Sequence, residues 1–164
     1  MAVKPVPEGY HTLTPFLTVR DAERAIEFYK QAFGAELRGG GVAKGPDGKV
    51  MHAELKIGDS VIMLSDEYPE FGSRSPQSIG DSAMGLHIYL DNVDAAFDRA
   101  VKAGASVEMP VMDQFWGDRY GKLKDPFGHK WSIATHVRDM SQDEMKRGMD
   151  EAFAKAAPPV KKTA

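Results

Sequence analysis

Residues 117–136 read GDRYGKLKDPFGHKWSIATH and contain the signal that decides the fold. Within them, residues 125–128 (DPFG) predict a tight turn, because proline fixes φ at the second position and glycine tolerates a positive φ. After the turn the chain alternates, with Trp131, Ile133 and Thr135 on one face and polar or small residues on the other. The stretch therefore predicts a β-hairpin with one buried face and one face that lines a wetter space.

Length and charge restrict the class of protein. A chain of 164 residues can form one domain or two small fused modules. Its hydrophobic content of 42% and charged content of 27% are ordinary for a globular protein. The net charge of −3 leaves no basic surplus to neutralise phosphates, so we expect no nucleic-acid partner.

The chain contains no cysteine. This excludes disulfides, thiolate nucleophiles, zinc–thiolate sites and iron–sulfur clusters. Residues 1–9 lack the apolar core of a signal peptide, and no stretch has the apolar length needed to span a bilayer. We therefore expect a cytoplasmic protein without a membrane partner.

The order of predicted elements repeats once along the chain. Helical spacing of apolar residues predicts helices over 22–33 and 93–103, each ended by a Gly-Ala pair and followed by predicted strands. The expected organisation has these parts: an arm at 1–9, a domain at 10–138, a C-terminal helix at 139–157 and a disordered tail at 158–164. Within the domain we expect a first module at about 10–66, a long surface loop at 66–83 and a second module at about 84–138.

These features resemble the vicinal oxygen chelate superfamily, which includes glyoxalase I, bleomycin-resistance proteins and extradiol dioxygenases. The resemblance covers roughly positions 10–138 and is most similar to the PhnB-like branch. The residues that carry it are Val19-Arg20-Asp21, Gly48–Leu55, Leu64–Glu67 and the run from Trp116 to Trp131. It implies an α+β fold in which paired βαβββ modules form a cupped mixed sheet with helices outside. It also implies a cavity inside the cup and a homodimer.

Metal-dependent members of this superfamily place four ligands on inward strand faces. Those positions fall at Thr14, Met63, Gly85 and Ser132, and none of these residues is a good ligand for a divalent metal. We therefore expect the usual metal site to be lost. An unconventional set, His52, Glu54 and His87, would suit zinc, nickel or iron if the fold brought the three together. The alternative is that these side chains only hydrogen-bond to one another and to water.

Strand alternation and nearby aromatic residues predict the wall of the cavity. The expected ligand-binding residues are Phe16, His52, Glu54, Met63, His87, Tyr89, Trp116 and Arg119. Arg119 could grip an anionic group of a ligand, or it could form a structural ion pair.

Three functions remain open at this point. The first is a small-molecule-binding module with an apolar cavity and a few polar groups. The second is a metal-dependent lyase, isomerase or dioxygenase-like enzyme in which Glu54 or His52 moves protons. The third is a scaffold that acts through its dimer interface and C-terminal helix. The fold alone does not choose among them.

Overall fold

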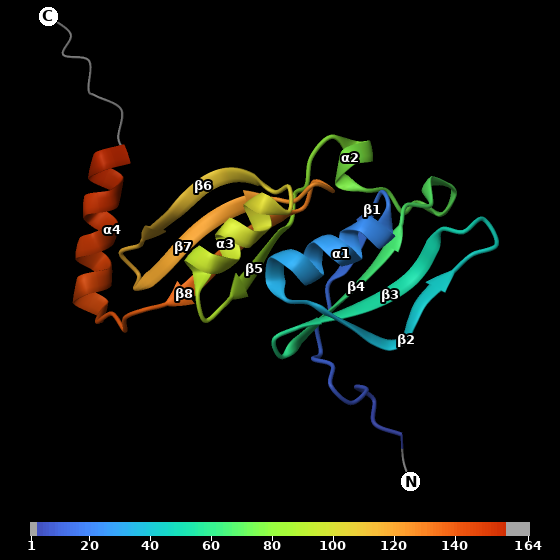
Figure 1. The fold of residues 1–164 in the computed structure, drawn as a ribbon. Coiled ribbons are helices and arrows are strands. Elements are labelled where there is room, and N and C mark those ends of the chain that lie inside the picture. Colours follow the sequence, from blue (N-terminus) through green and yellow to red (C-terminus); the bar gives the residue numbers. More distant parts are fainter. Residues whose placement is uncertain (1–2, 157–164) are drawn as a thin grey trace, which may run out of the picture.

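Two βαβββ modules follow each other in the chain, as the computed structural model of residues 3–156 shows (Figure 1). The first module consists of β1 (Phe16–Val19), α1 (Ala22–Phe33), β2 (Glu36–Lys44), β3 (Val50–Ile57) and β4 (Ser60–Asp66). The second consists of β5 (Gly85–Tyr89), α3 (Val93–Lys102), β6 (Ser106–Asp113), β7 (Asp118–Lys124) and β8 (Lys130–His136). The predicted α+β fold of two βαβββ modules is confirmed.

Each module contains one four-stranded mixed sheet. The strand orders are β1-β4-β3-β2 and β5-β8-β7-β6, so the same topology occurs twice. In each sheet the first strand pairs in parallel with the last, and the other neighbours are antiparallel. The predicted hairpin at residues 117–136 forms β7 and β8, with Leu123 opposite Trp131 in its register.

Helices α1 and α3 pack against each other and cover one side of the two sheets (Figure 1). Their buried residues recur at helical spacing, as Ala22, Ala25, Ile26 and Tyr29 do in α1. The apolar core is continuous between the modules, because one cluster of buried residues includes members of both. We call the sheet side that faces the helices the core side and the opposite side the open face.

Asp125 in the DPFG turn joins the two modules. Its buried carboxylate accepts hydrogen bonds from the backbone amides of Phe127 and His129, each at 2.9 Å. It also accepts from the Tyr29 hydroxyl of α1 at 2.7 Å and from the indole of Trp131 at 2.9 Å. Burial and the neighbouring Asp125 charge raise the pKa of Tyr29 well above its ordinary value, so the phenol stays a donor.

The segment between the modules is more structured than the predicted surface loop. It contains a 3₁₀ turn at Pro69–Phe71 and the short helix α2 at Pro76–Ile79. Glu67 anchors it by accepting from the hydroxyls of Ser75 at 2.7 Å and Ser78 at 2.5 Å. Burial raises the pKa of Glu67, but these bonds and Arg20 outweigh burial and lower the pKa to about 2. Hydrogen bonds between Glu67 and serines eight and eleven residues later give no periodic signal, which explains the prediction of a plain loop.

Helix α4 (Gln142–Ala156) lies beyond the second module and extends away from both sheets (Figure 1). Its first turn has a capping box, in which the Glu144 carboxylate accepts from the Ser141 amide and the Ser141 hydroxyl accepts from the Glu144 amide. Within the described part of the chain, no helix combines the length and apolar character needed to cross a membrane. The predicted tail at 158–164 lies outside the described residues.

Asp125→Ala should destabilise the protein strongly. The substitution leaves two side-chain donors and two backbone amides without their buried acceptor, so we expect the free energy of unfolding to fall by about 3 kcal/mol or more. Urea denaturation followed by circular dichroism measures this change.

Asp98→Ala is the matched control, because Asp98 is an exposed aspartate on α3. It should change the free energy of unfolding by less than about 0.5 kcal/mol. Equal stability of the two variants would contradict the role given to Asp125.

Candidate functional site

A row of side chains crosses the open face of the first module. Cross-strand pairing places Phe16 beside Met63, Met63 beside Glu54, and Glu54 beside Arg38. His52 lies on the same face, with its ring centroid 6.2 Å from that of Phe16 and its Nε2 3.2 Å from Glu54 Oε1. Phe16, His52, Glu54 and Met63 were all predicted to point away from the helices, and the structure places them there.

The N-terminal segment covers part of this face. The hydroxyl of Tyr10 donates a hydrogen bond to Glu54, and the guanidinium carbon of Arg38 lies 4.4 Å from the centroid of the Tyr10 ring. The hydrogen bond from Tyr10 lowers the pKa of Glu54, with a smaller contribution from His52, while burial acts in the opposite direction. The same hydrogen bond raises the pKa of Tyr10. At neutral pH the contact therefore joins a neutral phenol to a carboxylate.

Aromatic side chains gather on the open face of the second module. The His87 ring stacks on Tyr120 with centroids 5.9 Å apart and meets Tyr89 edge-on at 4.7 Å. Trp116 meets Tyr120 edge-on at 5.5 Å, and the Tyr120 hydroxyl lies 2.8 Å from Ser132 Oγ. His87, Tyr89 and Trp116 were predicted site residues, and the structure brings them together around Tyr120.

Asp118 is the charged centre of this aromatic group. It is buried and accepts hydrogen bonds from Trp116 at 3.0 Å and from Tyr89 at 3.2 Å, and its other oxygen lies 2.8 Å from His136 Nδ1. Burial raises the pKa of Asp118, but these three hydrogen bonds outweigh burial and lower it. The hydrogen bonds to Asp118 and then to Asp139 raise the pKa of His136. Each group therefore favours the charged form of the other.

A cavity of about 550 Å³ lies between the modules. The turn from β3 to β4 forms one wall with Ile57, Val61 and Ile62, and β5 forms the other. The β5 residues that line it are Leu86, His87, Ile88, Tyr89 and Leu90. Both faces of β5 contribute because β5 is the edge strand of its sheet. The wall is mainly apolar, with His87 and Tyr89 among its few polar groups.

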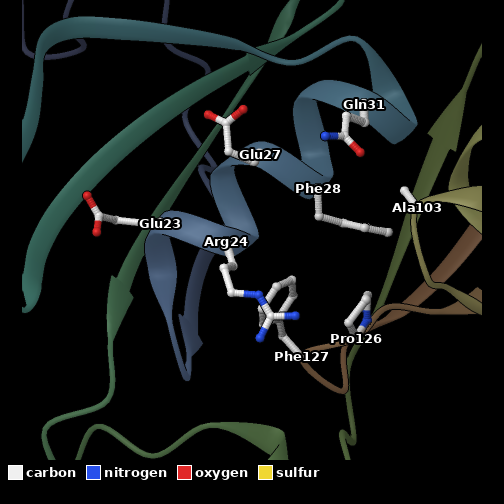
Figure 2. A pocket seen from close by; sticks show the side chains of 8 residues that line it. All are labelled: Glu23, Arg24, Glu27, Phe28, Gln31, Ala103, Pro126 and Phe127. Carbon is white, nitrogen blue, oxygen red and sulfur yellow. The ribbon is translucent and has the colours of Figure 1, made fainter.

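A second hollow of about 330 Å³ lies on the helix side, between α1 and the DPFG turn (Figure 2). Glu23, Arg24 and Glu27 border it from α1, with Pro126 and Phe127 opposite. Both glutamates form 2.7 Å ion pairs with lysines. None of the predicted site residues borders this hollow.

The position of Arg119 differs from the expectation that it lines the ligand cavity. In the register of the hairpin Arg119 lies opposite Thr135, whose hydroxyl accepts from a backbone amide of α3, so both face the core side. The Arg119 guanidinium makes two hydrogen bonds to Asp94, at 2.6 and 2.7 Å, and one to Asp113 at 3.0 Å. The placement of Arg119 in the same wall as Trp116 is therefore wrong. The alternative given for it, a structural ion pair, is present with Asp94 and Asp113.

The loss of the superfamily's usual metal site stays a prediction, because it depends on the four positions that the resemblance assigns to its ligands. The four corresponding positions hold Thr14, Met63, Gly85 and Ser132, a set without an imidazole or a carboxylate. Of the unconventional set, the structure brings His52 together with Glu54 on the first module, while His87 belongs to the second sheet. Among residues 3–156, no three histidine or carboxylate side chains are arranged to hold a metal ion.

Sequence reasoning missed Tyr10 and Arg38 and gave Asp118 no place in a site. Asp118 shares the alternation of β7 with Tyr120, on the hairpin face predicted to be polar, so the pattern could have identified it. Arg38 required the register between β2 and β3, which contains bulges between Arg38 and Ala43. Tyr10 lies outside any strand or helix, and no pattern in the sequence indicates where its side chain lies.

Two mixed four-stranded sheets of identical topology, each with a helix on its core side, define the class of this protein. Residues 10–133 match the Glyoxalase/Bleomycin resistance protein/Dioxygenase superfamily. The chain therefore belongs to this superfamily, which confirms the resemblance drawn from its sequence.

Two proteins with similar sequences illustrate how far the similarity extends along the chain. The uncharacterized protein Rv0887c of Mycobacterium tuberculosis (strain ATCC 25618 / H37Rv) is 45% identical over 141 residues, which are 84% of this chain and 81% of that protein. Protein YjdN of Escherichia coli (strain K12) is 28% identical over 145 residues, 74% of this chain and 92% of YjdN.

Solved structures show the same fold. TioX from Micromonospora sp. ML1 has a TM-score of 0.60 at 25% identity and covers 77% of this chain and 99% of its own. A gene product of Arabidopsis thaliana has a TM-score of 0.58 at 27% identity and covers 76% and 98%. These names state no ligand or reaction, so they support the family and the fold.

Asp118→Asn should lower the pKa of His136 toward its ordinary value of 6.5. The asparagine keeps the shape of the site but loses the charge that favours the imidazolium. Because the folded pKa is raised, the contact stabilises the wild type fully below about pH 6.5, and this stabilisation is lost as the pH rises through the folded pKa. Histidine titration by NMR measures the pKa in both proteins.

Asp139→Asn is the matched control for this titration, since the Asp139 carboxylate is fully exposed and makes the longer contact of 3.1 Å. It should lower the pKa of His136 less than Asp118→Asn does. A wild-type His136 that titrates at or below 6.5 would refute the assignment.

Proposed function

We propose that this protein binds a small, mainly apolar molecule in the cavity between its modules. The observation that carries the proposal is the composition of that cavity, which is lined by apolar residues of both modules and contains a few polar groups. Ligand sites in proteins are typically concave, apolar and oriented by a small number of polar side chains. A volume of about 550 Å³ lies within the range of such sites.

His87 and Tyr89 are the polar groups that orient the ligand in this proposal. Tyr89 is held by its hydrogen bond to the buried Asp118, and His87 is held by its ring contacts with Tyr89 and Tyr120. A side chain held by its neighbours loses little freedom on binding, which favours affinity. The ligand would place its polar atoms toward this pair and its apolar body against Ile57, Ile62 and Ile88.

The proposal is for binding and does not include a catalytic step. The predicted catalytic candidates, Glu54 and His52, lie on the open face of the first module and do not line the cavity. The placement of the chain in the PhnB-like branch is also a proposal, supported by the run from Trp116 to Trp131. The expected cytoplasmic location and the expected absence of a bound metal both stay predictions.

A homodimer is the second part of the proposal. Within residues 3–156, strands β1 and β5 each pair with a neighbour on one side only, which leaves two short edges able to accept another strand. Apolar side chains are exposed near these edges, with Phe16 at 49% and Tyr89 at 61% of their full accessibility. Association of two copies would cover these surfaces.

Ile88→Trp should weaken binding of the fluorescent probe 8-anilinonaphthalene-1-sulfonate. The wild type should bind one probe per chain with a saturable rise in fluorescence, and the larger side chain should fill the cavity and weaken binding at least about tenfold, or about 1.4 kcal/mol. Fluorescence titration measures both affinities.

Val107→Trp is the matched control, because Val107 is exposed on β6 and lies outside the cavity. It should leave probe affinity unchanged. Circular dichroism must show that all three proteins are folded, since this probe also binds partly unfolded chains. Equal probe affinity in Ile88→Trp and wild type would refute the proposed cavity.

Multi-angle light scattering should give a mass of twice the 18.0 kDa of one chain. Phe16→Asp should shift the population to single chains, because it places a charge on the exposed edge strand β1. A wild-type mass of one chain at every concentration tested would refute the dimer.

A further inference from the structure

The segment before β1, residues 3–15, is longer than the arm predicted at 1–9, and we call it the arm from here on. Tyr10 anchors it to the open face of the first module. Two side chains hold the phenol of Tyr10: Glu54 accepts a hydrogen bond from its hydroxyl, and the guanidinium carbon of Arg38 lies 4.4 Å from its ring centroid. Arg38 Nη2 also donates to the backbone oxygen of Glu8 at 2.6 Å. The contacts combine a charge-assisted hydrogen bond with a cation–π interaction.

The groups that receive the phenol belong to the sheet rather than to the arm. Arg38 and Glu54 are cross-strand partners on β2 and β3, and His52 lies 3.2 Å from the second oxygen of Glu54. Antiparallel pairing fixes the spacing between Arg38 and Glu54 independently of Tyr10. The receiving site is therefore built by the fold, while its occupant comes from a segment outside any helix or strand.

The arm fills this site incompletely. Arg38 Nη1 is buried from solvent and has no hydrogen-bond partner within residues 3–156. A buried cationic donor without an acceptor is unfavourable, and protein structures contain few of them. A ligand that carried an oxygen acceptor beside its aromatic ring could satisfy this donor, which the phenol of Tyr10 alone does not do.

Gly9 permits the close contact between arm and sheet. Its φ is +78°, and a Cβ atom at this position would lie 2.6 Å from Arg38 Nη2. A side chain at residue 9 would therefore require both a strained backbone and a displaced guanidinium.

We propose that Arg38 and Glu54 form a binding site for phenols and that Tyr10 occupies this site as a tethered internal ligand. A free phenol would compete with Tyr10 and release the arm. Because His11, Leu13 and Pro15 of the same arm line the cavity between the modules, release would also open that cavity. The site itself is separate from the cavity, so it does not depend on the function proposed above.

Tyr10→Ala in the full chain, titrated with 4-methylphenol, tests the proposal. The variant removes the internal ligand, and 4-methylphenol reproduces the lost side chain. Chemical shifts of backbone amides in β2 and β3 should saturate, with an affinity at least about tenfold higher for the variant than for the wild type, because a mostly occupied site weakens the apparent affinity of a competitor. Toluene, which lacks the hydroxyl, should cause no saturable shift of the Arg38 and Glu54 amides, which lie outside the cavity between the modules.

Two further variants test which contacts hold the phenol. Tyr10→Ala with Glu54→Gln should bind 4-methylphenol at least about tenfold more weakly than Tyr10→Ala alone, because the acceptor has lost its charge. Tyr10→Phe keeps the ring over Arg38 and should show an affinity between those of wild type and Tyr10→Ala. The backbone spectrum of each variant shows whether it is folded.

Equal affinity of wild type and Tyr10→Ala for 4-methylphenol would overturn the proposal, as would a folded Tyr10→Ala that binds no phenol. Ile88→Trp distinguishes the phenol site from the cavity between the modules. Added to Tyr10→Ala, it should weaken binding of the fluorescent probe and leave the affinity for 4-methylphenol unchanged. Loss of both binding events in Ile88→Trp would show that there is one site, and would also overturn the proposal.

Discussion

The buried carboxylate of Asp125 is the interaction on which the arrangement of the two modules depends. It accepts four hydrogen bonds, two from its own turn, one from Trp131 of β8 and one from Tyr29 of α1. A turn, a strand and a helix from different modules therefore share a single acceptor. The neighbouring His129 adds a contact of 3.0 Å between its Nε2 and the backbone oxygen of Thr18 in β1. Because both contacts cross the module boundary, they fix how the first sheet lies against the second.

The candidate sites follow from this arrangement. Packing of both helices on the core side leaves two open faces and a cavity between the sheets that neither module could form alone. The open face of the first module carries the charged pair Arg38 and Glu54, with His52 beside Glu54, whereas that of the second is aromatic around Asp118. Of the eight residues predicted to form one wall, four therefore lie on the first open face and three on the second, while Arg119 lies on the core side.

Alternation along strands was sufficient to predict which way many side chains point. Glu54 and Tyr89 were assigned to the correct faces because their apolar neighbours had to be buried. Arg119 was assigned to the wrong face because its orientation depends on pairing with Thr135, and strand register is not visible in a single sequence. The position of Tyr10 depends on contacts with residues about thirty and more than forty positions away. Local pattern carries no information about such contacts.

The most direct test of the account is an isotope-filtered NOE experiment on the protein with bound 8-anilinonaphthalene-1-sulfonate. If the cavity between the modules is the binding site, the probe should show NOEs to methyl groups of both walls at once, Ile62 from the first module and Ile88 from the second. NOEs confined to one module, or to the hollow beside Phe28 and Pro126, would contradict a binding site formed by the two modules together.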